Sequence, residues 1–119
     1  MSTTNSLVYA KAYQFAIRIV NAYKHLTEEK KEFVLSKQLL KSGTSIGANI
    51  AEANGAISKA EFKAKMSIAY KETLETKYWI SLLKDTGYIS EKAFESLYLD
   101  ADEIGKMLFT IIQNTQPNH

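Results

Sequence analysis

Apolar residues recur every three or four positions along most of this chain, the spacing that places them on one face of an α-helix. Four stretches with this spacing predict helices at about residues 6–25, 28–54, 58–85 and 90–114. Strand-like alternation of apolar and polar residues is nowhere sustained. Because the connections are short, neighbouring helices should run antiparallel. The pattern therefore predicts an all-α, up-and-down four-helix bundle that occupies residues 1–119 as a single domain.

Capping residues indicate where two of these helices begin. Thr27 precedes Glu28 and Glu29, so we expect the second helix to start at residue 28, with Thr27 as its N-cap and the two carboxylates in its first turn. Ser58 and Glu61 have the spacing of a capping box, in which each side chain bonds the other residue's amide. The third helix should therefore begin next to Ser58.

Glycines mark helix ends and one close contact. Gly55 and Gly87 follow the second and third predicted helices, where glycine can take the left-handed conformation that ends a helix. Gly43 and Gly47 instead lie inside the second helix, where each costs about 1 kcal/mol relative to alanine. They belong to the small-residue segment SGTSIGANIAEANG, residues 42–55. We expect this segment to be a seam along which a neighbouring helix packs closely.

The composition is that of an ordinary globular domain. The chain has 119 residues, of which 45% are hydrophobic and 24% charged, and this is enough for one hydrophobic core. Cysteine is absent, which excludes disulfides and thiolate metal sites and fits a reducing cytoplasm. No apolar run reaches the ~18–20 residues of a membrane span, and MSTTNS does not resemble a secretory signal. We expect a cytoplasmic protein without a membrane partner.

The sequence lacks the residue sets that metal binding and catalysis need. Its two histidines are His25 and His119, and neither follows a glutamate at the E-x-x-H spacing of di-iron bundles. The acidic groups that would otherwise suggest a metal site are Glu72 with Glu75, and Asp100 with Asp102 and Glu103. We interpret the second group as a solvated helix face, and we predict no catalytic residue, no metal and no cofactor.

Five polar residues are candidates for a structural cluster between the second and third helices. Ser45, Asn49 and Glu52 lie along one stripe of the second helix, and Glu72 and Glu75 are three residues apart on the third. We expect Asn49 to meet one of the two glutamates in a hydrogen-bonded cluster that fixes the register of the helices. A buried carboxylate needs a partner, and the candidate lysines are Lys41 and Lys71. A ligand pocket and plain solvent exposure are the alternatives.

Positive charge is concentrated in the first half of the chain. Residues 1–60 contain eight Lys/Arg against four Asp/Glu, whereas residues 61–119 contain seven against nine. Two helical stripes result, Lys11 with Arg18, and Lys30 with Lys37 and Lys41. Such stripes can follow a phosphate backbone with salt-dependent affinity, and the excess of lysine over arginine favours nonspecific contact. Ordinary solubilising charge is the alternative.

The helices carry more apolar residues than one bundle core requires. The residues beyond the core stripes are Leu7, Tyr9, Tyr13, Ala16 and Val20 on the first helix, and Tyr70, Tyr78 and Trp79 on the third. A helix in a bundle needs about one apolar face for its core, and large exposed apolar patches mark interfaces. We therefore expect the protein to associate with copies of itself.

Several short segments resemble a known family. They are Gln38-Leu39, Ser45-Ile46, Asn49-Ile50-Ala51-Glu52, Glu61-Phe62, Ile68-Ala69, Glu72, Glu75 and Gly87-Tyr88. The most specific is SI-x-x-NIAE at residues 45–52, in which Gly47 stands where members often carry proline. From about Val8 to Ile112 the chain resembles the 23S rRNA intervening-sequence protein family, many members of which are called four helix bundle proteins.

The resemblance implies a small bacterial protein that forms a homo-oligomer, in known relatives a ring of five subunits. It also implies a relationship to the accessory variability protein of diversity-generating retroelements, a basic pentamer thought to bind nucleic acid and a reverse transcriptase. On this basis we expect a non-enzymatic homopentamer that binds RNA or DNA nonspecifically through the basic faces of its first two helices. The alternative is a structural adaptor that engages another protein without nucleic acid.

Overall fold

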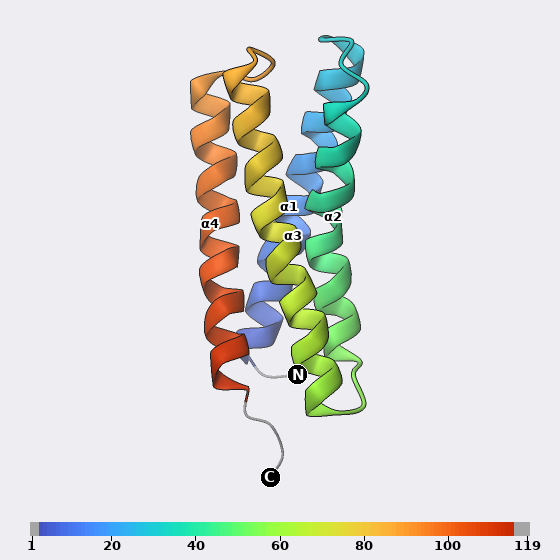
Figure 1. Cartoon of the computed structure of the whole chain (residues 1–119), viewed down its shortest axis with the longest axis vertical. Coiled ribbons are helices and arrows are strands. Elements are labelled where there is room, and N and C mark those ends of the chain that lie inside the picture. Colours follow the sequence, from blue (N-terminus) through green and yellow to red (C-terminus); the bar gives the residue numbers. More distant parts are fainter. Residues whose placement is uncertain (1–2, 116–119) are drawn as a thin grey trace.

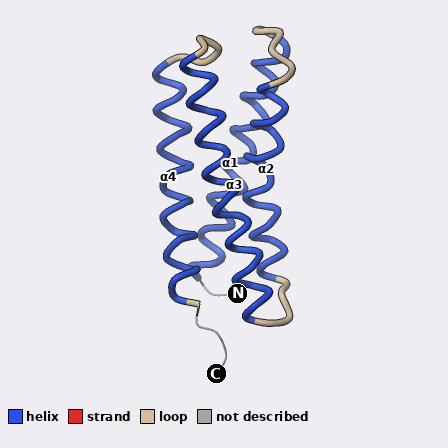
Figure 2. The backbone as a smooth tube through the Cα atoms, viewed as in Figure 1, coloured by secondary structure: helices blue, strands red, loops and turns tan. Residues whose placement is uncertain are grey.

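The computed structural model describes residues 3–115, which form four helices. They are α1 (Thr3–Glu28), α2 (Leu35–Asn54), α3 (Lys59–Asp85) and α4 (Glu91–Asn114). The helices lie side by side and alternate in direction, with the α1–α2 and α3–α4 connections at one end of the bundle and the α2–α3 connection at the other (Figure 1). Loops are confined to these ends, and the described residues contain no strand (Figure 2). The predicted all-α class with four helices is confirmed.

Each helix packs on two neighbours. Both α1 and α3 contact α2 and α4, with the most extensive contacts between α2 and α3 and the fewest between α1 and α4. Within residues 3–115, α1 does not contact α3 and α2 does not contact α4. These two pairs therefore occupy diagonal corners of the bundle, so the outward surfaces of α1 and α3 lie on opposite sides of the molecule.

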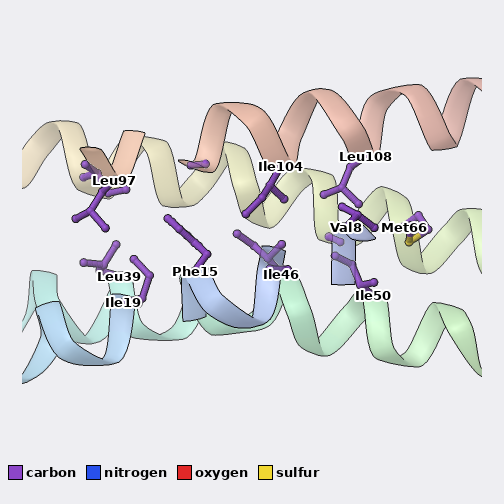
Figure 3. Packing of buried hydrophobic residues seen from close by; sticks show 14 of the residues in the cluster. Val8, Phe15, Ile19, Leu39, Ile46, Ile50, Met66, Leu97, Ile104 and Leu108 are labelled. Atoms are coloured by element: carbon purple, nitrogen blue, oxygen red, sulfur yellow. The ribbon is translucent and has the colours of Figure 1, made fainter. Parts of the chain in front are cut away.

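The core is a single cluster of buried side chains that follows the long axis of the bundle (Figure 3). Phe15 and Ile19 of α1, Ile46 of α2 and Leu108 of α4 are among its fully buried members. Fully burying an aliphatic or aromatic side chain of this size stabilises the fold by about 1.5–3 kcal/mol. These residues belong to the predicted stripes, so the three-and-four spacing identified the core face of each helix.

The second helix begins at Leu35, and the predicted start at residue 28 is wrong. Thr27 and Glu28 form the last turn of α1, where the Thr27 hydroxyl donates to a carbonyl one turn earlier at 3.0 Å. Lys31 then has a φ of 55°, a left-handed conformation that interrupts helical geometry. As a result Phe33, expected inside the helix, lies in the loop with 60% of its surface exposed.

A buried glutamate explains why α2 starts where it does. The carboxylate of Glu32 accepts hydrogen bonds from the amides of Val34, Leu35 and Ser36 at 3.0, 2.8 and 2.7 Å. Burial alone would raise the pKa of Glu32, but these bonds outweigh it and the pKa lies below its usual value. A carboxylate at this position also interacts favourably with the helix dipole. Glu32 thus satisfies amides that the missing preceding turn would leave free.

The other two helix starts follow the expected serines. The Ser58 hydroxyl accepts from the Glu61 amide at 3.0 Å, and the Ser90 hydroxyl accepts from the Ala93 amide at 3.1 Å. The Glu61 carboxylate accepts from the Ile57 amide at 3.2 Å, where a complete capping box would have used the Ser58 amide. The reciprocal bond is therefore displaced by one residue towards the loop.

The small residues of α2 form a seam with α1. A Cβ atom added to Gly43 would lie 2.8 Å from two carbons of Ile19, whereas one added to Gly47 would lie 3.7 Å from Ala12, an ordinary contact. The expected close approach is thus confirmed and is tightest at Gly43. At the ends of α2 and α3, Gly87 has the predicted left-handed φ of 84°. The corresponding prediction for Gly55 is wrong, because its φ is −98°.

Candidate functional site

Ser45 and Asn49 of the predicted polar cluster form local bonds within α2. The Ser45 hydroxyl donates to the Lys41 carbonyl at 2.6 Å, and the Asn49 side-chain amide donates to the Ser45 carbonyl at 2.8 Å. In the described part of the chain, no hydrogen bond joins Asn49 to Glu72 or Glu75. The helix backbone supplied nearer acceptors, so the structure does not bring Asn49 and the glutamates together.

The carboxylates of this predicted cluster lie at the surface. Glu52 accepts from Lys65 of α3 at 2.8 Å, and this bond raises the pKa of the Lys65 ammonium group. Glu75 accepts from the indole N–H of Trp79 at 3.0 Å, one turn along its own helix. Glu52 therefore does link α2 to α3, but through an exposed ion pair, a type of contact worth about 0–1 kcal/mol.

The buried polar contact between α2 and α3 is made by Ser42 and Thr76, which the sequence analysis did not select. Their hydroxyl oxygens lie 3.0 Å apart, and the Thr76 hydroxyl is also 2.7 Å from the Glu72 carbonyl. Both side chains are fully buried. The signal in the sequence was the presence of hydroxyl residues at core positions of the third-helix stripe, where Thr73 is buried as well.

Two of the five predicted nucleic-acid-binding residues are engaged within the bundle. Lys11 forms an ion pair with Glu103, and Arg18 forms one with Asp100 while donating to the Ser96 hydroxyl at 2.8 Å. These ion pairs line a hollow of about 330 Å³ between α1 and α4. The acidic face of α4 thus neutralises the basic stripe of α1 in the same subunit. Sequence spacing alone could not show this pairing.

The other three predicted residues keep their charge exposed. Lys30, Lys37 and Lys41 are exposed, and among the ion pairs of residues 3–115 none includes them. Lys30 lies in the α1–α2 loop because α2 begins at Leu35, so it does not extend a helical stripe as predicted. The basic surface of α2 is therefore the pair Lys37 and Lys41, with Lys30 beyond its N-terminal end.

An apolar surface runs along the outside of α1. We call Tyr9, Tyr13, Ala16, Ile17 and Val20 the α1 face. Tyr13 is 55% exposed and Ile17 is also exposed, whereas the other three are half-buried. The rings of Tyr9 and Tyr13 have their centroids 6.2 Å apart. Four of the five residues were predicted to lie outside the core, and Ile17 was missed.

A second apolar surface lies on α3 and α4. We call Tyr70, Leu74, Tyr78 and Phe109 the α3/α4 face. Tyr78 is 60% exposed, Leu74 and Phe109 are about half exposed, and the Tyr70 and Phe109 ring centroids are 5.9 Å apart. All but Tyr78 line a hollow of about 390 Å³ between the two helices. The predicted surplus residue Trp79 is half-buried and packs against the core.

Neither a metal centre nor a membrane span is found in the part of the chain that the structure describes. No three carboxylate or imidazole groups among residues 3–115 are placed to hold one metal ion, and His119 lies outside these residues. None of the four helices in that range combines the length and the apolar character needed to cross a bilayer. The candidate functional features are therefore outward surfaces of the bundle.

The fold and these surfaces define a four-helix bundle protein with no recognisable catalytic arrangement among the described residues. The sequence profile of the 23S rRNA-intervening sequence protein family matches residues 4–110, and the chain belongs to this family. The resemblance carried by SI-x-x-NIAE and the other segments is thereby confirmed. No curated protein matches the chain.

A solved structure is similar over almost the whole chain. It is the crystal structure of a protein with unknown function from the S23 ribosomal protein family of Bacteroides thetaiotaomicron VPI-5482. The two sequences are 52% identical, the TM-score is 0.93, and the similarity covers 94% of this chain and 100% of the other. Family membership thus supports the fold and assigns no activity.

Proposed function

We propose that this protein is a non-enzymatic, self-associating bundle that assembles in the cytoplasm as a homopentameric ring and binds RNA or DNA nonspecifically. The observation that carries the proposal is the exposure of apolar and aromatic side chains on the α1 face and the α3/α4 face. Contiguous exposed apolar surface of this kind marks interaction sites. The number of subunits rests on the resemblance, because known relatives form rings of five.

The nucleic-acid part of the proposal depends on Lys30, Lys37 and Lys41. Their ammonium groups are exposed and form no ion pair in the described structure, so they are free to contact phosphates. A ring would repeat this set in every subunit, and each phosphate contact would release counterions. Lys11 and Arg18 contribute less, because Glu103 and Asp100 already neutralise them.

Filter binding with duplex DNA and structured RNA between 50 and 200 mM salt tests this function. Affinity should fall steeply with salt, and Lys37→Glu with Lys41→Glu should weaken binding by about 10-fold or more at low salt. The matched control is Lys63→Glu with Lys92→Glu, which changes the net charge equally on exposed lysines of α3 and α4. An equal loss in both double variants would contradict binding through α2.

A structural adaptor is the second candidate, and the α1–α2 loop favours it. Phe33 and Val34 are 60% and 71% exposed there, next to lysines that would suit an acidic protein partner. Under this function neither nucleic acid binds even at low salt. Phe33→Ser with Val34→Ser should then abolish capture of one defined protein from the native host, while the wild-type chain retains it.

A further inference from the structure

We infer that self-association is heterologous, with the α1 face of one copy packed on the α3/α4 face of the next. This inference rests on the proposed self-association and names the two surfaces that meet in it. The partner is a second copy of this chain. Every copy then contributes a different surface to each of its two neighbours.

The location of the two faces favours this pairing. The α1 face and the α3/α4 face lie on helices at diagonal corners, because α1 and α3 make no contact with each other within residues 3–115. A two-fold symmetric dimer uses the same patch on both subunits. Such a dimer would cover one face twice and leave the other in water. A head-to-tail contact covers both faces in every copy, and it closes into a ring if the rotation permits.

The two faces also lie at the same height along the bundle. On α2, Gly43 lies against Ile19 of α1, and the adjacent Ser42 contacts Thr76 of α3. Ile19 and Thr76 are therefore nearly level, close to the Val20 and Tyr78 ends of the two faces.

The other half of the α1 face is aligned in the same way through α4. Lys11 pairs with Glu103, and Gly105, two residues further along α4, lies against Thr73 of α3. Lys11 lies between Tyr9 and Tyr13, and Thr73 lies between Tyr70 and Leu74. Because α1 and α3 run in the same direction (Figure 1), two copies with parallel axes bring the faces together without a shift.

Charge complementarity supports the same arrangement. The half of the chain with α1 and α2 carries eight basic against four acidic residues, a net charge of +4, and the other half carries seven against nine, a net charge of −2. Packing one half against the other half of a neighbour brings opposite signs together. Packing α1 faces on each other would bring like charges together, which is unfavourable.

Two double variants separate the two faces experimentally. Tyr13→Glu with Ile17→Glu disrupts the α1 face, and Leu74→Glu with Tyr78→Glu disrupts the α3/α4 face. All four positions are exposed on helices, where glutamate is a good helix former. Circular dichroism and thermal unfolding verify that the variants fold. Ile57→Glu, a control in the α2–α3 loop at a 95% exposed position, should leave the assembly unchanged.

Light scattering coupled to size exclusion gives the decisive masses. The wild-type chain should form an oligomer, and each double variant alone should elute at the monomer mass of 13.4 kDa. An equimolar mixture of the two double variants should form a particle of twice that mass. Each mixed pair has one intact α1 face opposite one intact α3/α4 face, and it cannot extend further.

The contrary outcomes are distinct. A mixture that remains monomeric, or a double variant that remains assembled, overturns the heterologous pairing while an oligomeric wild type upholds self-association. A wild-type chain that elutes at 13.4 kDa overturns both the pairing and the self-association on which it rests.

Discussion

Gly43 of α2 and Ile19 of α1 are in such close contact that a Cβ atom at position 43 would lie 2.8 Å from both Cγ1 and Cγ2 of Ile19. The Ile19 side chain is fully buried, and a β-branched residue in a helix has one strongly preferred χ1 rotamer. It therefore has little freedom to move aside. The absence of a side chain at position 43 sets the distance between α1 and α2 at this point.

We predict that Gly43→Ala destabilises the fold by about 1–3 kcal/mol, since overpacking a filled core forces side chains and backbone to shift. This loss should appear despite the roughly 1 kcal/mol by which alanine favours a helix over glycine. Gly47→Ala is the matched control, because its Cβ would make only 3.7 Å contacts, and it should be neutral or stabilising. Urea denaturation measures both variants. A Gly43→Ala protein as stable as Gly47→Ala would contradict the close contact.

The Glu32 cap should make part of the stability pH-dependent. Its pKa is lowered in the folded state, so the carboxylate stabilises the fold above the pKa of the unfolded chain, about 4.3. This contribution is lost as the pH falls through the lower folded pKa. Glu32→Gln should cost about 0.5–2 kcal/mol near neutral pH, the range measured for helix caps.

The comparison that tests the cap is the difference in unfolding free energy between wild type and Glu32→Gln from pH 7 to pH 3. This difference should shrink as the solution becomes acidic, because only the wild type loses the charged cap. All other carboxylates are common to both proteins and cancel. A difference that is constant over this range would show that the charge of Glu32 does not stabilise α2.

The buried hydroxyl pair should act as a unit. A hydroxyl has one hydrogen, so Thr76 donates to the Glu72 carbonyl when Ser42 donates to Thr76, in agreement with the 2.7 and 3.0 Å distances. Thr76→Val and Ser42→Ala should each cost about 1 kcal/mol. The double variant should cost less than the sum, because neither hydroxyl is then left without its partner.

A third hydroxyl provides the control for this cycle. Ser67 donates only to the Lys63 carbonyl of its own helix, at 2.8 Å and with water nearby. Ser67→Ala should therefore change the unfolding free energy by less than about 0.5 kcal/mol. Strict additivity of the Ser42 and Thr76 substitutions would argue against a bond between α2 and α3.

Removing the acids that neutralise α1 should strengthen binding to polyanions if the proposed nucleic-acid function holds. Asp100→Asn with Glu103→Gln would free Arg18 and Lys11 from their ion pairs. Each additional phosphate contact adds about 0.9 to the salt slope of the affinity for B-DNA. The exposed ion pairs contribute little stability, about 0–1 kcal/mol each. Unchanged affinity and slope in filter binding would show that these cations do not face the nucleic acid.

The helices and the core could be predicted from the sequence because their signal is local. Phe15, Ile19 and Leu108 are buried at positions that the three-and-four spacing selected. The start of α2 could not be predicted in this way. Thr27 and the glutamates after it have the pattern of a helix start, whereas the actual cap, Glu32, bonds α2 only after the chain has turned at Lys31.

The amino-acid sequence by itself determined the helical class, the core faces, the close contact at Gly43 and the family. Only the tertiary structure decided which polar groups meet. Arg18 pairs with Asp100, 82 positions later in the chain, and Thr76 meets Ser42 rather than a glutamate meeting Asn49. The physical reason is that periodicity records how each helix turns its apolar side inwards. Contacts between helices depend on the order, rotation and height at which the helices pack, which exist only in the folded bundle.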